Sequence, residues 1–560
     1  MVYQKNGWFG RGELTTPTSD SLRYVGILAL KIYTPEHLFT SLKRFLAKVC
    51  SYGSWGLDFC FTLLCLRFIG ASFYEAQGCF GPTLVIVGIY FGLACWRPRA
   101  ALFILALAAP LLMGFSATQL IFTSSPLFLS FSALWIGIFI HRWLFSKTKF
   151  IDPLATGNNI CFYGSWVIIA VDLLVACILI SMLVTLWPHR HEPRLWHVIY
   201  KISGIGYADK YYALHSAFIW LHGLFFYKSL TAIRFEEYLQ HNAAKQNRKS
   251  KSNLSSWFRF IIGAYTISLL GFSTLQYLSR IPDLNYNYFL LSPYEDMFSL
   301  GGATVMIWAA LLTFINLRSK TLFLLKFLVF IAVSFLLITT SVRGAWLAAG
   351  LAAILLAYLR LNTKSKVMIF TLVIISWATS IQLAKKGGVW DTNTYLHRLH
   401  SLIRIESIST KSSGRLDLYH KAVGMIKSRP WVGHGIGSFF LTSTQFASKD
   451  DPIGHQPEFA HNFILQFAAE LGIPATLLLF ALISVALLKG FKHSKAVLKN
   501  QERDLTPLAL FIALFAYLVS QMTFGALNIY IGQQYFFWFL IAALLGLPNS
   551  QAEKRTNAMR

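Results

Sequence analysis

Residues whose side chains could do chemistry gather in one stretch, 412–476, with a single arginine upstream. The candidates are Arg343, Ser413, Arg415, Gly435, Gly437, His461 and Asn462. Arginine stays charged at physiological pH and binds phosphate oxygens through a planar fork of N–H groups. Histidine can accept a proton near neutral pH. These residue types favour a site that binds a phosphate-bearing anion, such as a diphosphate, beside a general base.

Each of these polar groups is expected at the N-terminus of a helix, where free N–H groups and the helix dipole favour anions. Arg343 lies between two apolar runs, and its alternative role is to snorkel to lipid phosphates. Arg415 opens a loop helix that Ser413 could cap, and its alternative is a solvated surface arginine. A helix N-terminus disfavours the imidazolium, so His461 is expected to accept a proton. Helix capping or an interface role is the alternative for His461 and Asn462.

A polar helix and a glycine-rich turn lie between these arginines and the histidine. Residues 415–428 are predicted to form an amphipathic helix whose candidate packing face holds Leu416, Val423 and Ile426. The run SRPWVGHGIGSF then breaks the helical pattern with Pro430 and three glycines. Gly435, Gly437, Ser413 and Asn462 are candidates for substrate binding, whereas His434 is expected to be structural or to lie at the rim of the site.

Other kinds of chemical site are not indicated by the sequence. All seven cysteines fall in the first third of the chain without zinc spacing, so they predict neither disulfides nor a metal site. Asp450 and Asp451 alone would make a poor cation site, and the remaining histidines lack metal-ligand spacing. There is no P-loop and no GxSxG elbow. We therefore expect no metal and no cofactor, with arginines supplying the positive charge.

The rest of the sequence is dominated by apolar runs. With 55% hydrophobic and only 13% charged residues, the chain is too apolar for an ordinary soluble domain. Runs of about twenty continuously apolar residues predict an all-α polytopic membrane protein with about 12–14 transmembrane helices, rather than a β-barrel. The predicted spans are 52–72, 81–96, 100–123, 126–146, 160–187, 211–231, 256–279, 297–317, 321–340, 344–360, 366–384, 462–488, 505–527 and 533–548.

The formal net charge of +26 reflects the placement of lysine and arginine rather than affinity for nucleic acid. These residues fill alternate connections between spans, which predicts cytoplasmic loops and two cytoplasmic termini. The expected segments are a cytoplasmic or interfacial 1–50, transmembrane helices in 51–384, a large periplasmic loop at 385–461, C-terminal transmembrane helices in 462–548 and a cytoplasmic tail at 549–560. Within the first segment, 35–49 is either a helix on the membrane surface or a lead-in to the first span.

Four motifs give the chain a resemblance to a known family. They are SVRGAW at 341–346, SGR at 413–415, PWVGHGIGSF at 430–439 and HNFILQFAAELGIP at 461–474. In this order they resemble the O-antigen ligase and polymerase superfamily of bacterial envelope glycosyltransferases. The resemblance covers roughly residues 320 to 490, and the first 300 residues or so match only as generic spans.

The resemblance implies a GT-C-like fold in a bacterial inner membrane, with a large loop and the active site on the periplasmic side. It implies metal-independent transfer of a glycan from undecaprenyl diphosphate, in the ligases to a hydroxyl of lipid A–core. By the same resemblance, Arg343 and Arg415 bind the diphosphate and His461 activates the acceptor hydroxyl. Direct displacement by that hydroxyl would invert the anomeric centre.

Some positions depart from the ligase pattern. The spacing from His461 and Asn462 to Gly472 fits the family, but Ala475 replaces a usual Gly, Thr or Tyr, and Tyr419 replaces a common Trp. An O-antigen polymerase or a protein O-oligosaccharyltransferase therefore stays open. A transporter or flippase is a more remote alternative, supported only by Asp172 within a predicted span.

Overall fold

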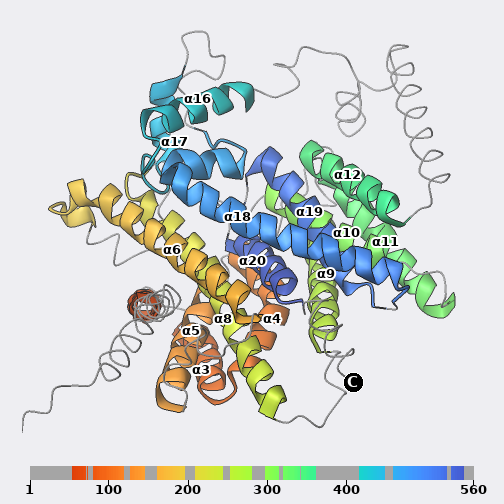
Figure 1. Ribbon diagram of the computed structural model, residues 1–560. Coiled ribbons are helices and arrows are strands. Elements are labelled where there is room, and N and C mark those ends of the chain that lie inside the picture. Colours follow the sequence, from red (N-terminus) through yellow and green to blue (C-terminus); the bar gives the residue numbers. More distant parts are fainter. Residues whose placement is uncertain are drawn as a thin grey trace, which may run out of the picture. The chain divides into compact units, whose positions relative to one another are not determined.

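Long apolar helices make up the described part of the chain in the computed structural model (Figure 1). The described residues are 53–70, 72, 80–118, 126–145, 160–195, 209–243, 253–279, 297–314, 320–340, 342–360, 415–447, 458–502, 504–525, 527 and 531–547. Two compact units divide the chain, residues 1–56 with 150–165 and residues 57–149 with 166–560. The architecture below is that of the second unit, which holds nearly all described residues.

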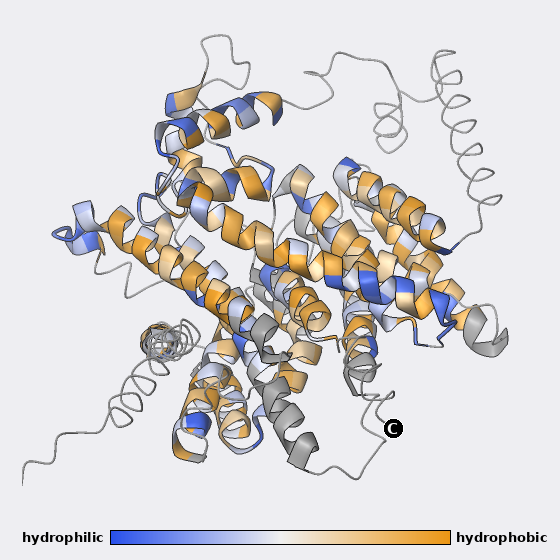
Figure 2. Cartoon of the chain, in the orientation of Figure 1, coloured by the Kyte–Doolittle hydropathy of each residue, from blue (hydrophilic) through white to orange (hydrophobic). Residues whose placement is uncertain are grey.

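The helices of this unit are those of an all-α polytopic membrane protein. Their bounds are α3 Phe80–Trp96, α4 Pro98–Thr118, α5 Pro126–Phe145, α6 Ile160–Leu186, η1 Trp187–His189, α8 Tyr212–Ala243, α9 Asn253–Ser279, α10 Met297–Phe314, α11 Lys320–Thr339, α12 Arg343–Arg360, α16 Arg415–Ser428, α17 Phe439–Thr442, η4 Ser443–Phe446, α18 Phe463–Lys499, α19 Thr506–Phe524 and α20 Ile531–Leu545. A further helix covers 53–70. Within the described ranges, five helices are long and apolar enough to cross a membrane: α5, α6, α12, α18 and α19. Figure 2 shows hydrophobic residues along these helices and more hydrophilic ones on α16 and the last turns of α18.

A helix stands at every predicted span except 366–384, which lies outside the described residues, as does the predicted surface segment 35–49. Two helices extend past the apolar runs that predicted them, α8 to Ala243 and α18 to Lys499. Hydropathy detects the segment that contacts lipid, whereas a helix continues wherever its backbone hydrogen bonds can form. The charged residues beyond 231 and 488 therefore extend the helices without extending the spans.

α19 lies at the centre of the helices that carry the candidate residues. It packs against α10, α12, α18 and α20. Its residues from Leu508 to Leu514 are buried on every side of the helix. A helix that is apolar all round is a buried helix. α19 therefore joins α12, which begins at Arg343, to α18, which begins after His461.

A cluster of charged side chains ties the helices of the first half together. Lys228 of α8 donates hydrogen bonds to Asp58 Oδ1 in the helix at 53–70 and, at 2.8 Å, to Asp172 Oδ1 in α6. Arg142 of α5 lies 3.7 Å from Asp58 Oδ2. We call these four residues the core charge cluster. Its two carboxylates are matched by two cations. Asp172, the residue that supported the transporter alternative, thus forms an ion pair with Lys228.

Candidate functional site

Arg343 is the first residue of α12, as predicted, and the close packing of α12 holds it in place. The buried residues of this helix are mostly small: Gly344, Ala345, Ala348, Ala349, Ala352 and Leu356. Small side chains let helices approach closely in a membrane, here α12 to α10 and α19. In the first turn of α12, Trp346 Nε1 donates back to Leu337 O of α11 at 2.9 Å and fixes the turn between the two helices. The partly exposed Arg343 side chain thus leaves a rigid helix end.

Arg415 is likewise the first residue of its helix, because α16 begins there as predicted. Ser413, the predicted cap of this helix, lies outside the described residues. The predicted packing face is wrong for Leu416 and Val423, which are exposed. The buried face is Leu418, Lys421, Ala422 and Met425, and it packs on Phe439, Ala460 and Ala469. Small residues such as Ala422 allow α16 to approach α18 closely, whereas the larger Leu416 and Val423 would hold the two helices apart.

His461 and Asn462 form the N-terminal boundary of α18. Asn462 is its N-cap, and its side-chain Oδ1 accepts the N–H groups of Ile464 and Leu465, both at 3.1 Å. His461 has a φ of 51°, a left-handed conformation that is strained for a residue with a side chain. Asn462 therefore caps the helix, as the capping alternative predicted. A contact between Asn462 and the substrate stays a prediction. The strained backbone at His461 suits a residue whose direction matters for function.

A break inside α18 connects this helix to the glycine-rich turn. Gly472 has a φ of 82° and a ψ of 172°, and Pro474 has no N–H to donate, so the helical bonding is interrupted. Three backbone hydrogen bonds to the turn use the groups that the break releases: His434 N–H to Ala469 O at 3.0 Å, Gly435 N–H to Glu470 O at 2.9 Å and Ile473 N–H to Pro430 O at 2.8 Å. Figure 1 shows α16 and α17, which flank the turn, beside the first turns of α18. The break is therefore a docking point for the turn.

Glu470 fixes the same turn through its side chain. Its carboxylate accepts the N–H of Gly437 at 2.8 Å, the N–H of Phe439 at 3.4 Å and the side-chain amide of Gln466 at 3.1 Å. The side chain is buried, and buried carboxylates are tolerated only with such partners. Glu470 thus holds the start of α17 against α18.

Gly435 and Gly437 have φ values of 106° and 73°, in the region that favours glycine. A Cβ on Gly435 would collide with the hydroxyl of Thr185 in α6, and one on Gly437 would lie 3.1 Å from Tyr212 O in α8. Both N–H groups bond to Glu470. The structure therefore gives the two glycines a packing role, and a direct contact with substrate stays a prediction. His434 is structural as expected, with Nε2 2.7 Å from Ser428 Oγ.

The structure brings Arg343 and Arg415 close enough for their charges to interact. Burial lowers the pKa of Arg415, Tyr419 opposes this shift, and the charge of Arg343 adds to it. The Tyr419 hydroxyl, one turn along α16, donates to Met522 O in α19 at 3.4 Å. One turn further along α19, a Cβ on Gly525 would lie 3.4 Å from His461 Cα. The end of α19 therefore connects the two arginines to the histidine.

His461 itself lies beside a carboxylate that the sequence reasoning did not select. His461 Nε2 is 3.3 Å from Glu458 Oε1. The hydrogen bond from His461 lowers the pKa of Glu458, and the charge of Lys421 contributes in the same direction. Lys421 is only 1% exposed although it is a lysine. We call Arg343, Arg415, Lys421, Glu458 and His461 the site cluster.

Signals for the missed residues exist in the sequence, but they are weak. Glu458 precedes His461 by three residues in PEFAHN, which is a spacing that allows contact but does not require it. Glu470 is a lone acid within an apolar run, and ionisable residues at such positions tend to mark function. Lys421 gave no signal, because an amphipathic helix normally directs its lysines to solvent.

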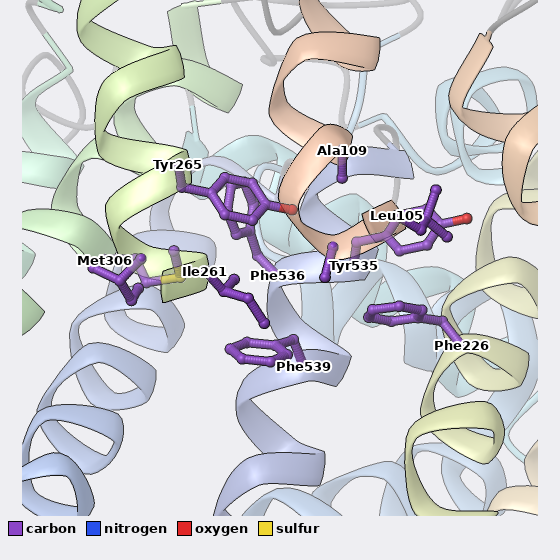
Figure 3. A pocket seen from close by; sticks show the side chains of 11 residues that line it. Leu105, Ala109, Phe226, Ile261, Tyr265, Met306, Tyr535, Phe536 and Phe539 are labelled. Atoms are coloured by element: carbon purple, nitrogen blue, oxygen red, sulfur yellow. The ribbon is translucent and has the colours of Figure 1, made fainter. Parts of the chain in front are cut away.

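A cavity elsewhere in the unit is not part of this site. It is a small apolar space between α4, α8, α9, α10 and α20, with Tyr265 and Tyr535 as its only lining residues that carry a polar group on the side chain (Figure 3). None of the candidate residues lines it. In the described ranges, no three His, Cys, Asp or Glu side chains lie together in a way that could hold a metal ion. The chemistry of the site is that of arginine, lysine, histidine and one carboxylate.

The comparison with protein families fits this geometry. Residues 301–480 match the family model described as O-antigen ligase. This segment is an O-antigen ligase domain. It runs from α10 into α18 and contains the whole site cluster, as well as the break at Gly472. The match supports the O-antigen ligase and polymerase superfamily that the four motifs predicted. No curated protein matches the chain.

Proposed function

We propose that the chain is an O-antigen ligase, which transfers a glycan from undecaprenyl diphosphate to a hydroxyl group of lipid A–core. The observation that carries the proposal is the match of residues 301–480 to the O-antigen ligase family, because this segment holds Arg343 and Arg415 at the first positions of α12 and α16. The two arginines also lie near enough for their charges to interact. Two guanidinium groups disfavour each other, and an anion with two charges between them would offset this cost. A diphosphate has the charge and the oxygen geometry for two arginine forks.

The reaction needs little beyond charge stabilisation and a base. The acceptor O–H bond breaks and its proton passes to the imidazole of His461. The acceptor oxygen forms a bond to the anomeric carbon, and the bond from that carbon to the diphosphate breaks. The diphosphate leaves with the electron pair and its growing charge is stabilised by Arg343 and Arg415. Attack opposite the leaving group inverts the anomeric centre.

Glu458 acts in this proposal as a positioning residue for His461. Its carboxylate accepts a hydrogen bond from the imidazole and offsets the positive charge that the ring gains with the proton. The hydrogen bond from His461 and, to a smaller extent, the charge of Lys421 favour the charged form of Glu458. The inner membrane of a bacterium, with the site on the periplasmic side and both termini in the cytoplasm, is the location that the charge pattern of the connections favours.

A lipopolysaccharide gel tests the proposal in a deletion strain that carries either the natural chain or a variant. Loss of the O-antigen ladder on deletion, with lipid-linked polymer retained, is the result expected of a ligase. A single-repeat band instead indicates a polymerase, and an intact ladder with an unglycosylated protein substrate indicates a protein O-oligosaccharyltransferase. Arg415→Ala should fail to restore the ladder, whereas Lys427→Ala, an exposed cation on the same helix, should restore it fully.

A further inference from the structure

Four residues at the end of α16 expose more apolar surface than their neighbours. Trp431 is 76% exposed and Val432 is 72% exposed. Arg429, just before them, is exposed as well. We call Arg429–Val432 the tip. A tryptophan and a valine this exposed, next to a cation, need a partner that suits both apolar and charged groups.

The backbone of the tip is held rigidly. Gly433 N–H donates to Arg429 O at 3.0 Å, and Ile473 N–H donates to Pro430 O at 2.8 Å. Trp431 O is so close to α18 that a Cβ on Gly472 would lie 2.5 Å from it. The tip therefore cannot fold back onto the protein to bury its side chains without breaking the junction with α18.

The depth of the tip relative to the bilayer can be inferred from which residues of α18 are exposed. From 463 to 472, where α18 is enclosed by α16, α17 and the glycine turn, no position is exposed. Exposure begins at Ile473 and continues at Leu477 and Phe480, which share one face of the helix. An exposed apolar face on a helix that is long and apolar enough to cross a membrane is expected to contact lipid, so we take this face as the lipid-facing side of α18. The hydrogen bond from Ile473 to Pro430 thus places the tip where the lipid-facing side begins.

We propose that the tip docks into the lipid headgroup layer, with Trp431 and Val432 at the boundary of the acyl chains and Arg429 at the phosphates. Tryptophan is enriched at this depth in membrane proteins, and arginine reaches lipid phosphates with its long stem. Its occupant is the bilayer itself, because the apolar tip is continuous with the lipid-facing side of α18. If the proposed function holds, the tip also keeps Arg343 and Arg415 at the depth of a lipid-linked diphosphate.

Spin labels measure this depth without any enzymatic activity. The chain would carry alanine at its seven cysteine positions and one label at Val432→Cys, in liposomes of phosphatidylethanolamine and phosphatidylglycerol. His420→Cys on exposed α16 is the aqueous reference, and Leu477→Cys on α18 is the hydrocarbon reference. Oxygen and a water-soluble nickel chelate report depth through their collisions with each label.

The proposal predicts a depth at 432 between those of the two references. Because the backbone of the tip is fixed to α18, Trp431→Ser should leave the label in place but make it more accessible to the nickel chelate, since water replaces the indole beside it. Trp431→Tyr should leave this accessibility unchanged, and the label at 477 should respond to neither change. A label at 432 that is as open to nickel as the label at 420 overturns the proposal. Shielding from both reagents also overturns it, because another protein segment or a second copy then covers the tip. The lipopolysaccharide gel tests the proposed function separately. The docking of the tip and the ligase function can therefore fail independently of each other.

Discussion

The core charge cluster and the site cluster both place charges among apolar helices, but they differ in balance. In the core charge cluster, Lys228 and Arg142 match Asp58 and Asp172, and Lys228 bonds directly to both carboxylates. In the site cluster, the charges that act on one another include two arginines of like sign. A balanced cluster fixes helices together. In the function proposed above, the two arginines bind a ligand that carries the opposite charge.

The position of each cluster along its helices supports the same distinction. Lys228 lies well inside α8 and Asp172 well inside α6. Arg343 and Arg415 are the first residues of their helices, and His461 lies two residues before α18. Helix N-termini offer N–H groups and a positive dipole end to an anion, whereas helix interiors do not. Variants can therefore separate a structural cluster from a binding one.

The largest effect on stability is expected from Lys228→Met. Removing the cation leaves Asp58 and Asp172 buried near each other, and loss of one partner of a buried ion pair costs about 3–5 kcal/mol. Thermal unfolding in detergent should show a strong loss of stability. The triple variant Lys228→Met, Asp58→Asn, Asp172→Asn should recover most of it. If the single change leaves the unfolding temperature unaltered, the cluster is not the structural tie described above.

Arg343→Ala should produce the opposite pattern, with a large loss of transfer and little loss of stability. A preorganised charged donor contributes roughly 3–4 kcal/mol to such a transition state, by analogy with an oxyanion hole. His461→Ala is expected to lose about a hundredfold or more through the missing base. Transfer would be measured on purified protein at matched unfolding temperatures. Full activity of either variant would remove that residue from the mechanism.

Gly472→Ala tests whether the break in α18 supports the site. The φ of 82° and the contact 2.5 Å from Trp431 O leave no room for a Cβ, so a cost of about 1–3 kcal/mol is expected. Gly350→Ala in α12 is the matched control, because open space surrounds Gly350. Gly472→Ala should lower both the unfolding temperature and the rate of transfer, whereas Gly350→Ala should change neither. Equal behaviour of the two would show that the break does not hold the turn.

Glu458→Gln should give the smallest effect. The lowered pKa of Glu458 means that its charge is present above the ordinary carboxyl range and is lost only as the pH falls through the lowered value. Because Glu458 is partly exposed, the loss of its charge should slow transfer at neutral pH by roughly two- to fivefold. As the pH falls through the lowered pKa of Glu458, the rate of the natural chain should fall toward that of Glu458→Gln. A ratio of the two rates that does not change with pH would mean that Glu458 does not act through its charge.

Much of the fold could be predicted from the sequence because membrane helices are long and continuously apolar. The helix starts at Arg343 and Arg415, and the one just after His461, followed from the same runs and from the motifs. The packing of α16 did not, because two apolar stripes compete on that helix and the choice between them depends on Ala469 in another segment. Amphipathic patterns show which residues are apolar, but not which stripe finds a partner.

The supporting residues of the site were the least predictable. Glu470 binds backbone N–H groups of a turn distant in sequence, and Lys421 is buried beneath its own helix beside Glu458. Their roles depend on a break in α18 that Gly472 and Pro474 permit but do not dictate. Side chains that hold a loop in place leave little pattern of their own, whereas side chains with chemical roles stand in recognisable motifs.

The proposed function requires that the site cluster bind a diphosphate through Arg343 and Arg415. Thermal unfolding of the purified chain with added undecaprenyl diphosphate tests it directly. A ligand that binds only the folded protein stabilises it by about 2.7 kcal/mol at a hundredfold excess over Kd, which appears as a rise in Tm. We expect this rise for the natural chain and for Lys427→Ala, and its loss in Arg343→Gln combined with Arg415→Gln. An equal rise in the double variant would contradict the assignment.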